Sequence, residues 1–134
     1  MGKEISKISQ MICVKNTNYK VVLFGPQFSG KTSVFQRIKS NEFYFKHPTI
    51  GVNVENININ NTNITIYDFG GHEKMKKLWE NYLVNIDLVI LVIDSTDKDS
   101  FIQLENIYEM LSKYIPHVYI LLLINKIDLK ESLE

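Results

Sequence analysis

Hydrophobic residues recur along this chain in two alternating patterns. Short continuous apolar runs occupy residues 21–24, within a first strand expected at 19–24, and residues 88–93 and 118–124; such runs are typical of parallel strands that are covered on both faces. Between the last two runs, apolar residues at helical spacing predict an amphipathic helix; they are Phe101, Leu104, Ile107, Leu111 and Ile115. Strands that alternate with helices predict an α/β fold with a doubly wound sheet.

A period of two appears in the middle of the chain. Isoleucine alternates with polar residues in 56–59 and again in 63–66, and Asn60-Asn61 interrupts the alternation. Alternation on both sides of a two-residue polar break is typical of a β-hairpin. We therefore expect an antiparallel hairpin at the edge of the sheet.

The most informative motif follows the first apolar run. Residues 25–32 read G-x-x-x-x-G-K-T, and apolar residues on one helical face follow them, namely Val34, Phe35 and Ile38. A strand, a glycine-bounded loop and a helix in this order predict a phosphate-binding loop, whose backbone N–H groups converge on anionic oxygens. Lys31 is expected to bridge the terminal phosphates and Thr32 to bind Mg²⁺ through its hydroxyl. The expected ligand is a nucleoside triphosphate.

Composition and charge narrow the class of protein. With 134 residues, of which 45% are apolar, the chain fits one domain with a sizeable core. Fifteen basic and fifteen acidic residues give zero net charge, which argues against a nucleic-acid partner. The one cysteine, Cys13, cannot form an internal disulfide, which favours a reducing compartment. No apolar run is long enough to span a bilayer.

The N-terminal segment has a pattern of its own. Its apolar residues predict an amphipathic helix; they are Ile5, Ile8, Met11 and Ile12. The opening sequence M-G-K-E-I-S fits the N-myristoylation pattern, with Gly2 as the acylated residue. From these residues two interpretations stay open: an acylated membrane helix, and an ordinary helix docked on the domain.

Two loops beside the hairpin carry further candidates. Pro48 disfavours a helix before it, so Thr49 is expected in a loop, where it offers a second hydroxyl to the magnesium. After the hairpin, Asp68 stands at a strand end, and a glycine pair follows it. The backbone N–H of Gly71 is placed to meet a terminal phosphate in this interpretation.

The last apolar run is followed by Asn125-Lys126-Ile127-Asp128. N-K-x-D at a strand end, downstream of a phosphate loop and a D-x-G-G turn, resembles the guanine-recognition motif of small GTPases. The resemblance implies that Asp128 accepts two hydrogen bonds from guanine, that Lys126 lies along the base, and that Asn125 joins this loop to the phosphate loop. Adenine lacks the matching donors, and a site built to hydrogen-bond a group rejects an analogue that lacks it.

Further motifs point to one branch of these GTPases. Four features resemble the ADP-ribosylation-factor-like branch of the ADP-ribosylation-factor and Sar-like family: the Gly2 start with its amphipathic helix, the P-T-I-G sequence of 48–51, the turn at 68–71, and Leu78-Trp79 with Tyr82. This implies a P-loop fold with a mostly parallel, doubly wound sheet and an antiparallel edge hairpin. It also implies a myristoylated N-terminal helix that moves to a membrane in the GTP state. Expected partners are an exchange factor, a GTPase-activating protein and effectors, and the expected location is cytoplasmic, with reversible attachment to the Golgi or another endomembrane.

The resemblance also assigns the site residue by residue. The residues expected to bind GTP or GDP and Mg²⁺ are Gly25, Gln27, Phe28, Ser29, Gly30, Lys31, Thr32, Ser33, Thr49, Asp68, Gly71, Asn125, Lys126 and Asp128. Thr32 and Thr49 are the expected metal ligands. Asp68 is expected to act on the metal through water.

Hydrolysis is expected to depend on three residues. His72 stands where the family usually has the glutamine that orients the attacking water, a replacement that resembles the Sar-type coat GTPases. A histidine can position water through one ring nitrogen, and Gly71 and Lys31 complete the expected catalytic residues. Phosphoryl transfer relies on positioning and charge stabilisation, and Arg37, the one arginine, lies on the first predicted helix. We therefore expect slow intrinsic turnover and an activating protein.

Length is the main departure from the family. The family continues beyond the equivalent of residue 134 with a helix, a sixth strand and a final helix. We therefore expect an N-terminal helix and linker in 1–18, an incomplete G domain in 19–134, and an unpaired apolar sheet edge at 118–124. The favoured function is a slow GTPase switch in membrane or vesicle trafficking. A truncated or inactive GTPase-like binding module is the alternative, and an ATP-dependent P-loop enzyme would require the N-K-x-D match to be accidental.

Overall fold

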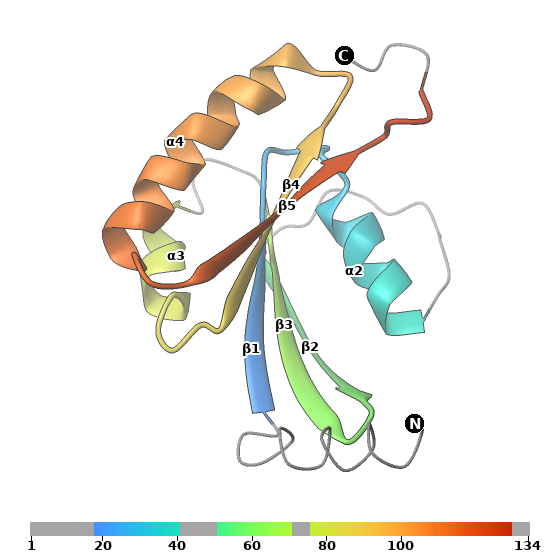
Figure 1. Ribbon diagram of the computed structural model, residues 1–134, viewed down its shortest axis with the longest axis vertical. Helices are drawn as coiled ribbons and strands as arrows, with labels where there is room; N and C mark the ends of the chain where they lie inside the picture. Colours follow the sequence, from blue (N-terminus) through green and yellow to red (C-terminus); the bar gives the residue numbers. More distant parts are fainter. Residues whose placement is uncertain (1–17, 41–50, 71–75, 130–134) are drawn as a thin grey trace, which may run out of the picture.

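The computed structural model describes residues 18–40, 51–70 and 76–129. In this part of the chain five strands form one sheet and three helices cover it (Figure 1): β1 (Asn18–Phe24), α2 (Lys31–Ser40), β2 (Val52–Ile59), β3 (Thr62–Phe69), α3 (Lys76–Tyr82), β4 (Leu88–Asp94), α4 (Lys98–Tyr114) and β5 (Tyr119–Asn125). The strand order is β2-β3-β1-β4-β5, and only the β2–β3 pair is antiparallel. The predicted doubly wound fold with an antiparallel edge hairpin is confirmed.

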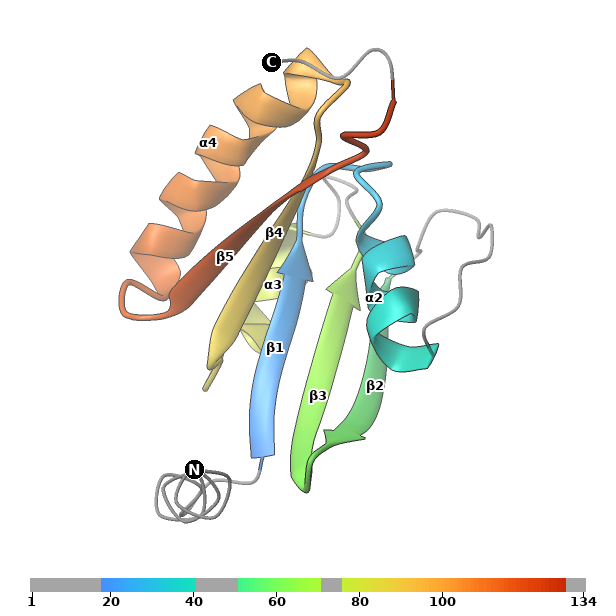
Figure 2. The ribbon, with the colours of Figure 1, turned by 45° about the vertical axis from the view of Figure 1, so that its right-hand side comes forward.

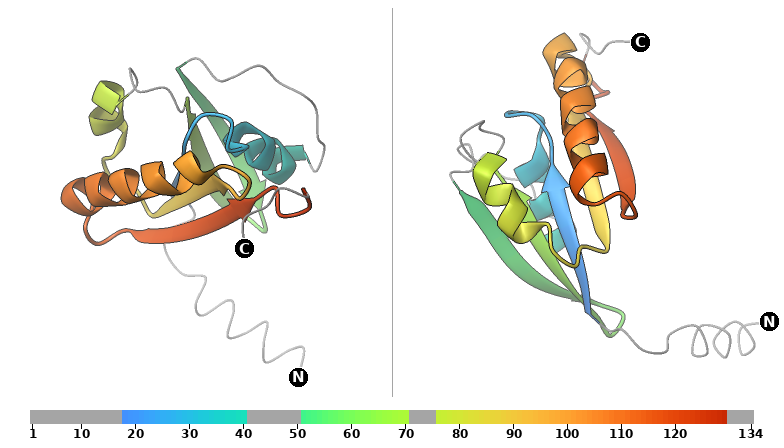
Figure 3. Two further views of the ribbon diagram at one scale, coloured as in Figure 1. Left: turned by 90° about the horizontal axis from the view of Figure 1, so that it is seen from above. Right: turned by 90° about the vertical axis from the view of Figure 1, so that its left-hand side faces the viewer.

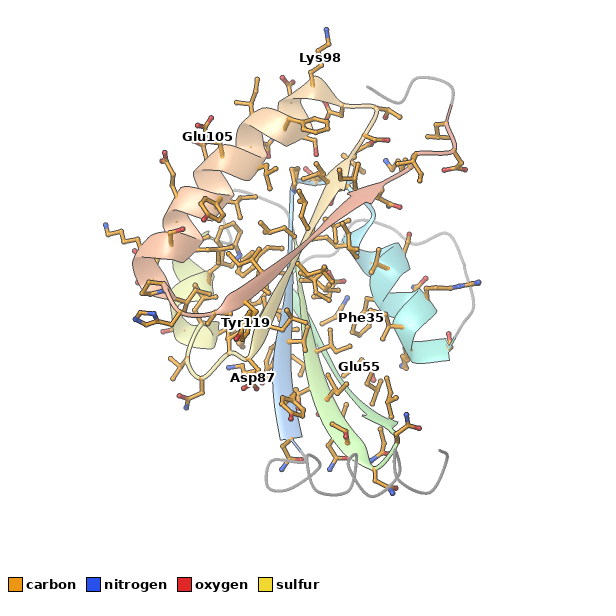
Figure 4. All side chains as sticks on the ribbon, viewed as in Figure 1. Phe35, Glu55, Asp87, Lys98, Glu105 and Tyr119 are labelled. Atoms are coloured by element: carbon orange, nitrogen blue, oxygen red, sulfur yellow. The ribbon has the colours of Figure 1, made fainter. Side chains whose placement is uncertain are left out.

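Helices lie on both faces of the sheet, with α2 on one face and with α3 and α4 on the other (Figure 3). Alternate residues of β1 serve the two faces: Leu23 belongs to the core under α2, and Val22 to the core under α3 and α4. From α2, Phe35 points toward the sheet (Figure 4) and is 4% exposed. The doubly wound arrangement therefore buries the central strands on both sides.

An aromatic cluster packs the end of the sheet just before the phosphate loop. Phe24 stacks on Phe69 with ring centroids 5.1 Å apart, and Trp79 of α3 meets Phe24 edge-on at 4.9 Å. Tyr82 adds a further edge contact to Phe69 at 5.4 Å. Each such pair adds about 1 kcal/mol beyond the apolar area that it buries. The cluster fixes the carboxyl ends of β1 and β3, from which the site loops start.

The hairpin has the turn that its sequence predicts. Asn60 and Asn61 have φ angles of 50° and 63°, which match the type I′ turn favoured in two-residue hairpins. The register pairs Ile57 with Ile64 across β2 and β3. The predicted hairpin is confirmed.

The expected burial of the last two strands is only half right. In β4 the residues Val92 and Ile93 have no exposed surface, as the continuous apolar pattern predicted. In β5 Leu121, Leu122 and Ile124 are 44–50% exposed, which contradicts the burial suggested by the continuous apolar run alone but agrees with the unpaired apolar edge expected at 118–124. The reason is that, within the described ranges, β5 has a strand neighbour on one side only, and only Val118, Ile120 and Leu123 of 118–124 pack against the two cores.

All the loops of interest leave the same edge of the sheet. Because β1, β3, β4 and β5 run parallel, their carboxyl ends lie together, and Figure 2 shows β1 and β3 pointing toward this edge. Ligands of open α/β sheets bind outside the carboxyl ends of the strands. The fold thus brings together loops that are about a hundred residues apart in the sequence.

Candidate functional site

The phosphate loop follows β1 and approaches its neighbours too closely for side chains at its two glycines. A Cβ on Gly25 would lie 2.0 Å from the carbonyl oxygen of Val92 in β4. A Cβ on Gly30 would lie 2.2 Å from Nδ2 of Asn125, and Gly30 also has a φ of +95°. At Gly25 only a bare backbone fits, because the close atom is a backbone carbonyl oxygen. At Gly30 the positive φ favours glycine, and a side chain would also displace the Asn125 amide.

A third residue of the loop has a left-handed backbone that the sequence does not signal. Phe28 has a φ of 64°, which is sterically costly for a bulky residue, and its side chain is 68% exposed. Gln27 beside it is also exposed. Both side chains therefore lie at the surface of the loop, and the loop turns its backbone inward. Backbone strain of this kind clusters at functional sites.

Lys31, the first residue of α2, places its amine inside the loop. Its Nζ donates to the carbonyl oxygens of Gly25 at 2.9 Å and Pro26 at 2.6 Å. Burial lowers the pKa of Lys31 to about 8, against the opposing charge of Asp68. A desolvated cation of this kind interacts strongly with an anion that enters the loop.

Thr32 and Asp68 form the second part of the site. The hydroxyl of Thr32 donates to Oδ2 of Asp68 at 2.8 Å, and Asp68 is completely buried near the end of β3. Ser33 follows Thr32 in the same helical turn. Hydroxyl and carboxylate oxygens suit Mg²⁺, which takes most of its ligands from water and phosphate. Within the described ranges no three His, Cys, Asp or Glu side chains come together as a metal site.

The N-K-x-D segment lies against the phosphate loop. Nδ2 of Asn125 donates to the carbonyl oxygen of Ser29 at 3.0 Å, and Nζ of Lys126 donates to that of Phe28 at 2.7 Å. Asp128 is exposed in the turn that follows β5. The predicted base loop and the predicted phosphate loop are thus in direct contact.

Asp94, at the end of β4, is a member of this cluster that the sequence reasoning missed. Its Oδ2 accepts from Nζ of Lys126 at 2.5 Å, and its Oδ1 accepts from the N–H and the hydroxyl of Thr96 at 2.9 and 2.7 Å. Burial acts to raise the pKa of Asp94, but the hydrogen bonds from Lys126 and Thr96 outweigh it and hold that pKa below its usual value. The available signal was an acidic residue at the end of a buried strand next to β5 in a parallel sheet.

The structure places most of the predicted site residues in one cluster, and others lie outside the described residues. The cluster contains Gly25, Ser29, Gly30, Lys31, Thr32, Asp68, Asn125 and Lys126. Four predicted residues lie outside the described residues; they are Gly2, Thr49, Gly71 and His72. The N–H of Gly70 donates to the carbonyl oxygen of Gly51 at 3.0 Å, so the segments that flank Thr49 and Gly71 meet. In the part of the chain that the structure describes, every helix is too short or too polar to cross a membrane.

The chemistry of the cluster fits a ligand that carries phosphate and Mg²⁺. The hydroxyl of Ser29 is buried with no hydrogen-bond partner in the described part of the chain, so the loop has a polar group left to satisfy. Lys31 supplies a buried cation, and the Thr32–Asp68 pair supplies oxygen ligands.

Comparison with known proteins gives a consistent assignment. Residues 5–134 match the ADP-ribosylation factor family. The chain is 38% identical over 117 residues to human ADP-ribosylation factor-like protein 5A, an alignment that covers 86% of this chain and 65% of that protein. It is 35% identical over 135 residues to the human putative ADP-ribosylation factor-like protein 5C, which covers 99% of this chain and 74% of the relative. It is 35% identical over 131 residues to ADP-ribosylation factor-like protein 5 of Caenorhabditis elegans, which covers 96% and 73%. With its phosphate loop, its Thr32–Asp68 pair and its N-K-x-D loop in one cluster, the chain belongs to the ADP-ribosylation factor family of small GTPases.

Proposed function

We propose that this protein is a guanine-nucleotide switch that binds GTP with Mg²⁺ and hydrolyses it slowly, in membrane or vesicle trafficking. The observation that carries the proposal is the junction of the two loops, in which Asn125 and Lys126 bind the backbone of the phosphate loop. The base and the phosphates of a nucleotide lie a fixed distance apart, so the loops that bind them must be held next to each other. The family assignment supports guanine as the base.

The site residues take distinct roles in this proposal. Lys31 binds the terminal phosphates, Thr32 together with Thr49 binds the magnesium, and Asp68 acts on the metal through water. Asp128 recognises the guanine edge. The magnesium supplies charge neutralisation on the phosphate oxygens. Because Thr32 already bonds Asp68, the hydroxyl is held at the buried carboxylate before any metal arrives.

We propose that turnover depends on His72, which positions the attacking water, with Gly71 and Lys31 stabilising charge on the phosphate. Positioning and charge stabilisation carry most of phosphoryl transfer, so a missing positive group lowers the rate by orders of magnitude. Arg37 lies on α2, where its position in the last turn places it away from the phosphate loop. A GTPase-activating protein is therefore an expected partner, along with an exchange factor and effectors.

One observation favours a second candidate, a binding module of the same fold without turnover. The amine of Lys31 is already satisfied by the carbonyl oxygens of Gly25 and Pro26. Phosphates must replace these two hydrogen bonds in order to bind, which opposes tight binding. Measured GTP hydrolysis by the nucleotide-loaded chain separates the two candidates.

Titration with fluorescent GDP and ATP tests the proposal. GDP is expected to bind at least 100-fold more tightly than ATP, because a base site with unsatisfied acceptors rejects adenine. Asp128→Asn is expected to weaken GDP by about 100-fold and to relax specificity toward xanthine, since the acceptor facing the base gains a donor. Asp87→Asn, at the opposite end of β4, is the matched control and should leave both affinities unchanged. Equal binding of GDP and ATP would rule out guanine recognition.

We also propose that residues 1–18 attach the G domain of 19–134 to membranes through a myristoyl group on Gly2. A single myristoyl chain binds membranes only marginally, at about 10⁴ M⁻¹, so the apolar face of the N-terminal segment must contribute. Acylated protein loaded with a slowly hydrolysed GTP analogue is expected to float with vesicles, and the GDP-loaded protein much less. Flotation of Gly2→Ala at the level of the unaltered protein would contradict the proposal.

A further inference from the structure

Lys126 has two acceptors on different elements, and one of them, Asp94, belongs to neither the phosphate loop nor the N-K-x-D motif. Its Nζ lies 2.7 Å from the carbonyl oxygen of Phe28 and 2.5 Å from Oδ2 of Asp94. The Lys126 side chain therefore extends from the end of β5 to the phosphate loop, and Asp94 at the end of β4 forms an ion pair with its ammonium group. The Lys126 side chain is 31% exposed and that of Asp94 is 11% exposed, so this ion pair is shielded more than a surface pair.

The backbone of Lys126 requires such support. Lys126 has a φ of 62°, in the left-handed region that is unfavourable for residues other than glycine. A residue stays in that region only where surrounding contacts determine its conformation. Those contacts are the two acceptors of Nζ and the bond from the N–H of Leu129 to the carbonyl oxygen of Lys126 at 3.1 Å.

Asp94 is itself fixed from several directions. Its Oδ1 accepts two hydrogen bonds from Thr96, and its backbone N–H donates to the hydroxyl of Ser100 in α4 at 3.0 Å. The next residue, Ser95, donates its N–H to the carbonyl oxygen of Asn125 at 3.0 Å, so the turn after β4 and the base loop are joined by backbone as well. Both carboxylate oxygens of Asp94 are bonded within the protein, and the contact of Asp94 with the two loops runs through Lys126.

We propose that Asp94 is a positioning residue of the nucleotide site: its carboxylate holds the Lys126 side chain across the phosphate loop, so that the base loop and the phosphate loop keep a fixed separation. This rests on the function proposed above, because the separation matters only for a ligand that spans both loops. A charge-assisted hydrogen bond is about twice as strong as a neutral one, which suits a tie that must restrain a strained residue.

Asp94→Asn separates this role from general packing. The amide oxygen can still accept from Thr96, whereas an amide nitrogen in place of Oδ2 faces the Lys126 ammonium as a second donor. GDP dissociation, followed by fluorescent GDP release, is expected to be about tenfold faster than from the unaltered chain, since misplacement of a positioning group is costly. Asp94→Glu keeps the charge and should give an intermediate rate.

Asp87→Asn is the matched control. Asp87 accepts from the N–H of Lys20 at 2.7 Å and lies just before β4, at the end of the sheet away from the phosphate loop (Figure 4). Asp87→Asn makes the same chemical change and can keep the bond from Lys20 through its amide oxygen, without touching Lys126. Its GDP release is expected to match that of the unaltered chain, and thermal unfolding of each variant confirms that it is folded.

A double-mutant comparison decides whether Asp94 acts through Lys126. Lys126→Met keeps much of the side-chain stem but removes the ammonium, so adding Asp94→Asn to it should change GDP release less than twofold. Equal tenfold effects of Asp94→Asn with and without Lys126→Met would overturn the inference, as would unchanged release from Asp94→Asn alone. If Asp94→Asn does not fold, the rate for Asp94→Glu decides in its place, and a rate equal to that of the unaltered chain overturns the inference. Absence of GDP binding by the unaltered chain would instead overturn the proposed function, and the inference with it.

Discussion

Gly30→Ala is expected to weaken GDP binding by about 100-fold, because it pushes the base loop away from the phosphate loop. A Cβ at this position would lie 2.2 Å from Nδ2 of Asn125, the atom that donates to the carbonyl oxygen of Ser29. Asn125 must move to relieve the overlap, and its hydrogen bond to the phosphate loop is lost. Isothermal titration of the folded variant with GDP measures the effect.

Gly51→Ala is the matched control for backbone strain. Gly51 has a φ of +89°, close to the +95° of Gly30, but a Cβ there would have no atom within 4 Å. Both variants therefore place alanine in the left-handed region, at a cost of about 1–2 kcal/mol of folding stability. Only Gly30→Ala should also lose affinity beyond this strain. Equal losses of GDP affinity in the two variants would show that strain, and not the contact with Asn125, matters.

Lys31→Met is expected to stabilise the nucleotide-free chain and to weaken its GDP binding by at least 100-fold. Lys31 is 6% exposed, and burial lowers its pKa from 10.5 to about 8, so the folded chain pays for keeping the ammonium out of water. Removing that charge should stabilise the free chain by about 1–3 kcal/mol, reduced by the free energy of the two hydrogen bonds that the loop carbonyl groups lose. Chemical denaturation and GDP titration measure the two opposite effects.

Lys39→Met on the same helix is the control for Lys31→Met. Lys39 is 45% exposed along its side chain and pairs with Glu55 at 2.7 Å, an exposed pair of the kind that contributes little. Neither stability nor GDP affinity should change appreciably. A loss of stability in Lys31→Met would mean that the hydrogen bonds to Gly25 and Pro26 outweigh the cost of burying the charge.

The lowered pKa of Lys31 should also make the folding stability of the free chain and its affinity for GDP depend on pH. Below pH 8 Lys31 is charged in both the folded and the unfolded chain, so the folded state bears the full cost of the buried charge. Between pH 8 and 10.5 the unfolded chain holds a proton that the folded chain has released, so stability should rise with pH across this window. GDP binding needs the charged amine and should weaken by up to tenfold per pH unit above pH 8. Lys31→Met should abolish the rise in stability.

Local pattern in the sequence determined the fold class and most of the proposed site. The alternation of apolar runs with helical spacing predicted the strand and helix order, because periods of 2 and 3.6 are set by backbone geometry alone. Asn60-Asn61 predicted the hairpin turn, since asparagine tolerates the positive φ that this turn requires. The phosphate-loop motif and the N-K-x-D motif are each a continuous stretch of sequence, so each can be found in a single sequence.

Contacts between distant segments were decided only by the tertiary structure. The apolar pattern of 118–124 does not distinguish an edge strand from a central one; the family resemblance predicted the edge, and the structure gives the exposure of each side chain on it. Phe28 has a left-handed backbone because the loop must turn its carbonyl groups toward Lys31, Asn125 and Lys126, and no local rule predicts that for a phenylalanine. Asp94 and Lys126 are 32 residues apart in the sequence, but they are in contact because β4 and β5 are parallel and end at the same edge of the sheet. No sequence pattern links the two residues.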